Sequence, residues 1–263
     1  MMNSDSTQKP SFISNASSPR QRRVTPFGEM IAVGDGGNVM GNRGGLQHTK
    51  GRSAGVQRPE AWIICRIESG NRHRPKVDPD QYTELFFWDE ATALAAGHRP
   101  CYECSRARYL AFVDAWRRGN PALSGEKKWN LAQLDNALAV ERLTDGISVR
   151  HYVEKIDALP TGTFISWLED KKRYPVLIND ERLLLWTPGG YCSSRLKPKG
   201  IEVEVLTPRL TVNALKAGYV PSIELPEMPL PVEYFDLFDY APRQGRYTRT
   251  EKYINEQFLR PIK

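Results

Sequence analysis

The chain has 263 residues, 40% of them hydrophobic, which is enough for a well-buried core in one large or two smaller domains. No stretch approaches the roughly 20 consecutive apolar residues of a membrane helix, and the N-terminal stretch lacks the basic and then apolar organisation of a signal peptide. We therefore expect a cytoplasmic protein without membrane contact. Four cysteines in so long a chain do not form a disulfide framework, and in a reducing compartment a close pair more often binds metal or does redox chemistry.

The net charge of +6 is unevenly distributed along the chain. Residues 1–58 carry eight basic and three acidic side chains, and residues 241–263 carry six and two. Residues 59–221 are close to balanced, and residues 222–240 hold five acidic groups and no basic one. Basic ends on a globular body are typical of proteins that bind polyanions, because lysines and arginines on phosphates release counterions. The alternative is that the positive charge only keeps the protein soluble.

The N-terminal part of the chain is rich in small polar residues and glycine. Residues 1–23 contain mainly Ser, Asn, Gln and Pro with few apolar anchors, which predicts a disordered arm. Seven glycines between positions 34 and 51 match neither glycine motif of phosphate-binding loops, and they favour a glycine-rich surface loop.

The next elements are predicted by short apolar runs and helix signals. The runs at 61–67 and 82–88 have the length of strands. Asp89 can cap a helix, and Gly97 fits its left-handed end. A further helix is predicted to begin near Ser105.

After a polar break at 119–128, the pattern changes from helix to strands. A helix is predicted in 129–146, with Leu131, Leu134 and Leu138 on its apolar face. Short apolar runs separated by turn signals then predict antiparallel strands at 161–168, 175–180, 182–186 and 201–206. A short helix is predicted at 210–218. Residues 222–263 are predicted to form an acidic and then basic tail.

The densest candidate chemistry lies in "GHRPCYECSR", residues 97–106. A C-x-x-C turn places the sulfurs of Cys101 and Cys104 within reach of one tetrahedral Zn²⁺, and Cys65, at the end of a predicted strand, can supply a third thiolate. A redox pair would need parallel βαβ units around it, and these are missing. A further alternative is that the cysteines are only small buried residues of a folding scaffold. The candidates for a fourth ligand are His98, His73, Asp78 and, less suitably, Ser69.

The stretch "TELFFWDEATALAAGHRPCYEC" resembles the zinc-binding domain of the Ada family, the methyl-phosphotriester repair proteins. The order of an aromatic strand, an alanine-rich helix, an Arg-Pro step and a C-x-x-C is shared, and the similarity extends from Trp62 to Ser105. The resemblance implies a small ββα module that binds zinc and lies on DNA. In that family a C-x-x-x-C on the preceding strand supplies two further thiolates, one of which accepts a methyl group. Here Cys65 matches the first and Ser69 replaces the second, so we do not expect Cys65 to be an efficient methyl acceptor.

The sequence thus predicts an α+β fold in which a small Ada-like ββα metal-binding module is followed by a region of mixed helices and antiparallel strands. The expected divisions are an arm at 1–23, the glycine-rich loop with the metal module at 24–128, helix and antiparallel strands at 129–221, and the tail at 222–263.

Two functions remain open at this level. The first is a nucleic-acid-binding protein, with DNA as the expected partner, in DNA repair or processing; its phosphate contacts would come from the basic ends and from Arg106, Arg108, Arg117 and Arg118. The second is an enzyme of hydrolase or nuclease type that acts on nucleic acid or nucleotides, with His48, Glu84 and His98, and also Asp89, as acid or base groups. His151 has the pattern of an ordinary strand residue, and Cys192 has no base near it in sequence.

Overall fold

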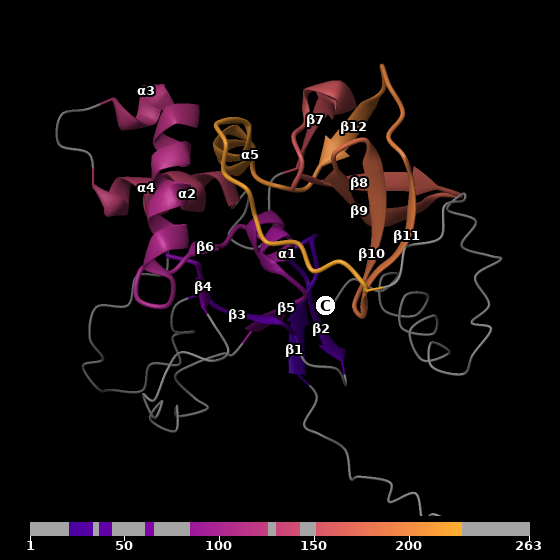
Figure 1. Cartoon of the computed structure of the whole chain (residues 1–263), viewed down its shortest axis with the longest axis horizontal. Helices are drawn as coiled ribbons and strands as arrows, with labels where there is room; N and C mark the ends of the chain where they lie inside the picture. The colour runs from indigo at the N-terminus through magenta and orange to yellow at the C-terminus, as the bar shows by residue number, and fades with distance from the viewer. Residues whose placement is uncertain are drawn as a thin grey trace, which may run out of the picture.

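A computed structural model describes residues 21–33, 37–43, 61–65, 85–125, 130–142 and 151–227 (Figure 1). These residues form a mixed α and β fold with two six-stranded sheets and five α-helices. The predicted α+β class is confirmed at this level.

The first sheet is mixed and contains the strands that carry the cysteine region. Its strand order is β2-β1-β5-β3-β4-β6, with β1–β5 and β4–β6 parallel and the other neighbours antiparallel. The strands are β1 (Gln21–Val24), β2 (Met30–Val33), β3 (Val39–Asn42), β4 (Ile63–Cys65), β5 (Leu85–Phe87) and β6 (Arg99–Pro100). Strand β1 begins inside the stretch that was predicted to be disordered, because its residues pair with β2 and β5.

Strand β3 lies among the glycines that predicted a surface loop. Two of these glycines, Gly37 and Gly41, serve close packing against β5. A Cβ atom on Gly41 would lie 2.4 Å from the Phe87 ring, and one on Gly37 would lie 2.5 Å from the Phe87 carbonyl oxygen. Only glycine lets the backbone approach an aromatic strand this closely.

Five α-helices accompany the sheets: α1 (Glu90–Ala95), α2 (Arg106–Gly119), α3 (Pro121–Ser124), α4 (Leu131–Arg142) and α5 (Arg209–Lys216). The predicted cap and end of α1 are confirmed, since Asp89 accepts a hydrogen bond of 2.8 Å from the Thr92 backbone N–H and Gly97 has φ +81°. Leu134 and Leu138 of α4 are buried as its periodicity predicted. None of the helices in the described ranges combines the length and apolar character that a membrane span requires.

The second sheet is antiparallel throughout, with strand order β11-β10-β9-β8-β12-β7. Its strands are β7 (Tyr152–Lys155), β8 (Phe164–Glu169), β9 (Lys172–Asn179), β10 (Arg182–Thr187), β11 (Gly190–Leu196) and β12 (Glu202–Val205). The four predicted strands correspond to β8, β9, β10 and β12. Strand β11 was missed because "GYCSSRL" has little apolar alternation; its pairing with β10 places it in the sheet.

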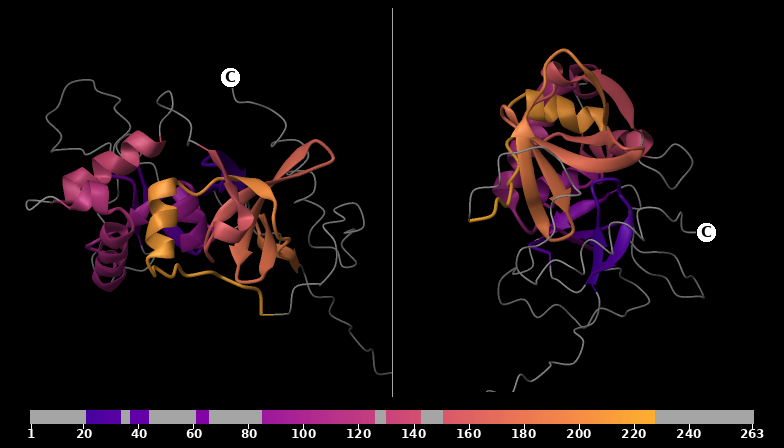
Figure 2. Two further views of the ribbon diagram at one scale, coloured as in Figure 1. Left: turned by 90° about the horizontal axis from the view of Figure 1, so that it is seen from above. Right: turned by 90° about the vertical axis from the view of Figure 1, so that its right-hand side faces the viewer.

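Helix α1 lies between the two sheets and belongs to the core on both sides. Ala93 and Leu94 pack with Phe87 of the first sheet, whereas Ala91 and Ala95 pack with the second sheet. In the right-hand view of Figure 2 the indigo strands of the first sheet lie below the orange strands of the second. A helix of six residues can be this completely buried because four of them are alanine or leucine.

A buried ion pair fixes β6 against α4. Arg99 donates from Nε to Asp135 Oδ1 at 2.6 Å and from a terminal nitrogen to Asp135 Oδ2 at 2.8 Å, and both side chains are almost inaccessible to solvent. This two-point geometry compensates both charges, which a buried ion pair requires. Because Cys101 follows β6 directly, the pair also holds the beginning of the C-x-x-C turn.

We predict that Asp135→Asn lowers the free energy of unfolding by about 3–5 kcal/mol, because it leaves the buried Arg99 guanidinium uncompensated. Asp114→Asn is the matched control, since Asp114 pairs with Arg118 on the surface of α2 and an exposed pair contributes less than about 1 kcal/mol. Urea unfolding of the three proteins measures the difference; equal losses for both variants would contradict the structural role of the buried pair.

Candidate metal centre

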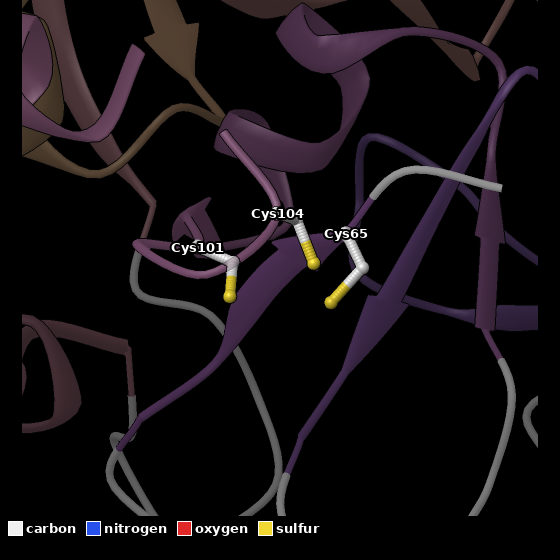
Figure 3. Close-up of side chains that lie close together, drawn as sticks. All are labelled: Cys65, Cys101 and Cys104. Atoms are coloured by element: carbon white, nitrogen blue, oxygen red, sulfur yellow. The ribbon is translucent and has the colours of Figure 1, made fainter. Parts of the chain in front are cut away.

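The sulfurs of Cys65, Cys101 and Cys104 point toward one another, and all lie within 4.8 Å of each other (Figure 3). They come from two segments that the first sheet brings together. Strand β4, which ends at Cys65, runs parallel to β6, and the Cys101 N–H donates a hydrogen bond of 3.0 Å to the Ile64 carbonyl. The expected meeting of Cys65 with the C-x-x-C is therefore present in the structure.

The two sulfurs of the C-x-x-C lie on one side of a tight turn. The Ser105 N–H donates to the Cys101 carbonyl at 3.1 Å, and α2 begins at the next residue. Cys101 is buried, and Cys104 is half-buried. The centre thus lies at the edge of the first sheet, at the start of α2.

The three thiols lie close enough for the ionisation of one to affect the others. The pKa of Cys101 falls to about 5, mainly because it accepts a hydrogen bond from the Cys65 thiol, with further donation from the backbone N–H groups of Glu103 and Cys104. The pKa of Cys65 is raised, first by its hydrogen bond to Cys101 and then by burial. The geometry already stabilises negative charge on sulfur, which is the form that binds a metal ion.

A metal ion fits this donor set. Three thiolates around tetrahedral Zn²⁺, each with a Zn–S distance of roughly 2.3 Å, have sulfurs roughly 3.8 Å apart, so the observed group needs only a small contraction. Within the described part of the chain, no histidine or carboxylate joins the three sulfurs. Three protein ligands leave one coordination position for a further group.

His98 is not among the side chains that converge in this group. Its ring packs against Phe87 and Trp62, with ring centroids 4.7 and 5.1 Å apart, and its Nδ1 lies 3.1 Å from the Ala96 carbonyl oxygen. Because a carbonyl only accepts, Nδ1 carries the proton. The residue is 1% exposed, and burial, together with the nearby Arg43 and Arg142, lowers its pKa well below 6.5.

This environment predicts a pH dependence of stability. Below about pH 6.5 the histidine takes up a proton when the chain unfolds, whereas it stays neutral in the folded protein. The free energy of unfolding is therefore retained above that pH and decreases as the pH falls below it. Between pH 7.5 and 5.5 this linkage amounts to up to about 1.4 kcal/mol. We expect His98→Asn to flatten the dependence of the unfolding free energy on pH, measured by urea unfolding at both pH values.

His151→Asn is the control for that measurement. Burial also lowers the pKa of His151, but the Glu204 carboxylate opposes the shift, so removal of His151 should change the slope less. A slope that is unchanged in His98→Asn would contradict the assignment.

The four arginines expected to contact phosphates have different environments on α2. Arg108 donates to the buried Glu90 and to the Val220 carbonyl, and Arg118 donates to Asp114 and to the Ala217 carbonyl. Both therefore hold α2 to the rest of the fold. Arg106 and Arg117 are exposed, and the Arg106 guanidinium lies 5.4 Å from the centre of the Tyr102 ring.

His48, His73, Asp78, Glu84 and Ser69 lie outside the described residues.

Two further residues have ordinary structural surroundings. Cys192 lies 3.7 Å from the Leu185 carbonyl oxygen, and burial raises its pKa to about 12, so its thiol stays protonated. His151 precedes β7 and contacts Glu204.

Sequence reasoning missed a cationic cluster around Trp62. The guanidinium groups of Arg43 and Arg142 lie 4.1 and 4.3 Å from the centre of this ring. Three residues so far apart along the chain produce no local motif, so only the folded structure reveals their contact.

Comparison of the chain with models of protein families, with curated proteins and with solved structures finds no match.

Proposed function

We propose that this chain is a zinc-binding protein that binds nucleic acid, with DNA as the expected partner, through an Ada-like module that acts in DNA repair or processing. The observation that carries the proposal is the convergence of Cys65, Cys101 and Cys104 at the start of a helix with exposed arginines.

Zinc is the metal that the donor set favours. Thiolate ligands in a C-x-x-C turn suit Zn²⁺, which accepts tetrahedral sulfur coordination without a redox change. When bound, the ion would supply a cross-link between strand β4 and the turn that precedes α2. The chain itself positions the ligands. The β4–β6 pairing sets the distance between Cys65 and Cys101, and the Arg99–Asp135 pair fixes the backbone just before Cys101.

The outer surface of α2 is suited to phosphate contacts. Arg106, Leu110 and Arg117 follow helical spacing, so they lie almost on one line along the helix, and all three are exposed. Tyr102 is exposed beside Arg106 and next to the metal centre. Guanidinium groups contact phosphates, and an exposed aromatic ring can stack on a base, so this surface supports binding of a polyanion.

We expect freshly purified, unchelated protein to contain about one equivalent of zinc by elemental analysis, and Cys101→Ser to lose most of it. Since structural zinc contributes folding free energy, the variant should melt at least about 6 °C lower, which corresponds to roughly 2 kcal/mol for a domain of this size. Cys192→Ser is the control, because Cys192 lies outside the three-sulfur group. Zinc far below one equivalent in the wild type, or an unchanged melting temperature in Cys101→Ser, would count against the metal centre.

For nucleic-acid binding, we expect the affinity for a labelled DNA duplex to fall linearly on a plot of log K against log salt concentration. Replacing both Arg106 and Arg117 by Ala should make the slope shallower by about 1.8, since each phosphate contact contributes roughly 0.9. Arg182→Ala serves as the control, because Arg182 lies on β10 and donates to Ser194 in the second sheet. Fluorescence anisotropy at several salt concentrations gives the slopes. Undetectable binding at low salt, or one slope for all three proteins, would refute the role of α2.

A further inference from the structure

The second sheet contains an opening between β8 and β12, with a cavity of about 350 Å³. Trp167, Ile201 and Val203 line its apolar side, and Leu168 and Glu202 lie on its rim. The Leu168 side chain is 68% exposed. This surface belongs to the second sheet, so it is separate from the cysteine centre at the edge of the first sheet.

The register of the two strands shows why the opening exists. The Leu206 N–H donates a hydrogen bond of 2.9 Å to the Phe164 carbonyl, and along an antiparallel ladder such hydrogen-bonding pairs recur at every second position. Ser166 and Glu204 therefore form the next pair, and they are aligned in the structure. Leu168 and Glu202 would form the pair after that. In the described strands, however, the β8–β12 ladder stops at Ser166 and Glu204.

Both strands continue beyond this point with their outer neighbours. Leu168 is aligned with Arg173 of β9, and Glu202 with Lys155 of β7. Because the N–H and C=O groups of every second residue face the same side of a strand, the main-chain groups of Leu168 and Glu202 are directed into the opening. The opening thus combines an apolar wall with two short stretches of strand edge.

We propose that this opening binds an extended peptide segment of a partner protein, which adds main-chain hydrogen bonds at Leu168 and Glu202. An extended peptide presents N–H and C=O groups at the spacing of a strand edge and places alternate side chains on opposite faces. Apolar side chains at alternate positions would contact Trp167, Ile201 and Val203, and the intervening ones would lie on the rim beside Leu168.

The charges of the opening disfavour a nucleic acid as its occupant. Arg173, which lines it, is bound to Glu204 and donates to Ser166 Oγ at 3.0 Å, so its charge is already compensated. Glu202 adds a carboxylate on the rim. The lining carries two carboxylates and one guanidinium, and the Arg195 guanidinium lies 4.4 Å from the centre of the Trp167 ring. Phosphates would therefore find no excess of positive charge here, whereas an apolar peptide needs none.

The probe for this site is a phage-displayed library of random 12-residue peptides, selected on the full-length protein. We expect the selected peptides to have apolar residues at alternate positions. A synthetic copy should bind Leu168→Lys at least tenfold more weakly by isothermal titration calorimetry. Leu196→Lys, which changes an equally exposed leucine at the end of β11, should bind within twofold of the wild type.

A second measurement tests the main-chain contacts on the unmodified protein. N-methylation of the peptide, one residue at a time, should weaken binding tenfold or more at alternate positions and leave the intervening positions within about twofold, since only every second N–H faces the strand edge. The proposal is overturned if no peptide is enriched above background, if Leu168→Lys and Leu196→Lys bind alike, or if N-methylation shows no alternation. It is also overturned if the protein dimerises through this opening, which would make a second copy the occupant.

Discussion

Two buried carboxylates at the start of α1 connect the separate parts of this fold. Asp89 caps the helix and accepts a hydrogen bond of 2.8 Å from the Tyr191 hydroxyl of β11, which links the helix to the second sheet. Glu90 accepts from Arg108 of α2 and from the Tyr219 hydroxyl beyond α5. Burial raises the pKa of Asp89 while its hydrogen bonds oppose that shift. A carboxylate this deeply buried is tolerated only when donors surround it, so the donors fix the mutual positions of α1, α2, β11 and the segment that follows α5.

This constraint also decides how two arginines of α2 are directed. Arg108 is directed inward because Glu90 needs a cation, and Arg106, two residues earlier, points outward beside Tyr102. The same helix begins directly after the C-x-x-C turn, so the orientation that Glu90 imposes on α2 also orients the turn. The three-cysteine group and the exposed arginines are therefore carried by one connected arrangement.

The sequence predicted the features that depend on neighbouring residues. The Asp89 cap and the Gly97 helix end follow from local patterns, and the structure contains both. The meeting of Cys65 with the C-x-x-C joins distant segments, and it was predicted from the metal-ligand chemistry of the cysteines. Other features that depend on distant partners had no such chemical signal in the sequence. Gly41 lies in a strand because it meets Phe87, and nothing beside it in sequence shows that contact. The packing of the His98 ring and the inward direction of Arg108 likewise arise from partners that only the fold brings near.

Contacts at the C-terminal end of α2 fix this helix, which lies at the edge of the first sheet, relative to the second sheet. A Cβ atom on Gly119 would lie 2.3 Å from the Asn213 carbonyl oxygen of α5, so the two helices pack backbone to backbone, and Asn120 adds hydrogen bonds to Leu210 and Asn213. Helix α5 follows β12 after a short connection. Helix α2 is thus held near its beginning by Glu90 and at its end by α5. A surface that recognises a ligand through a few side chains needs this kind of support, because small displacements of the backbone would move every contact at once.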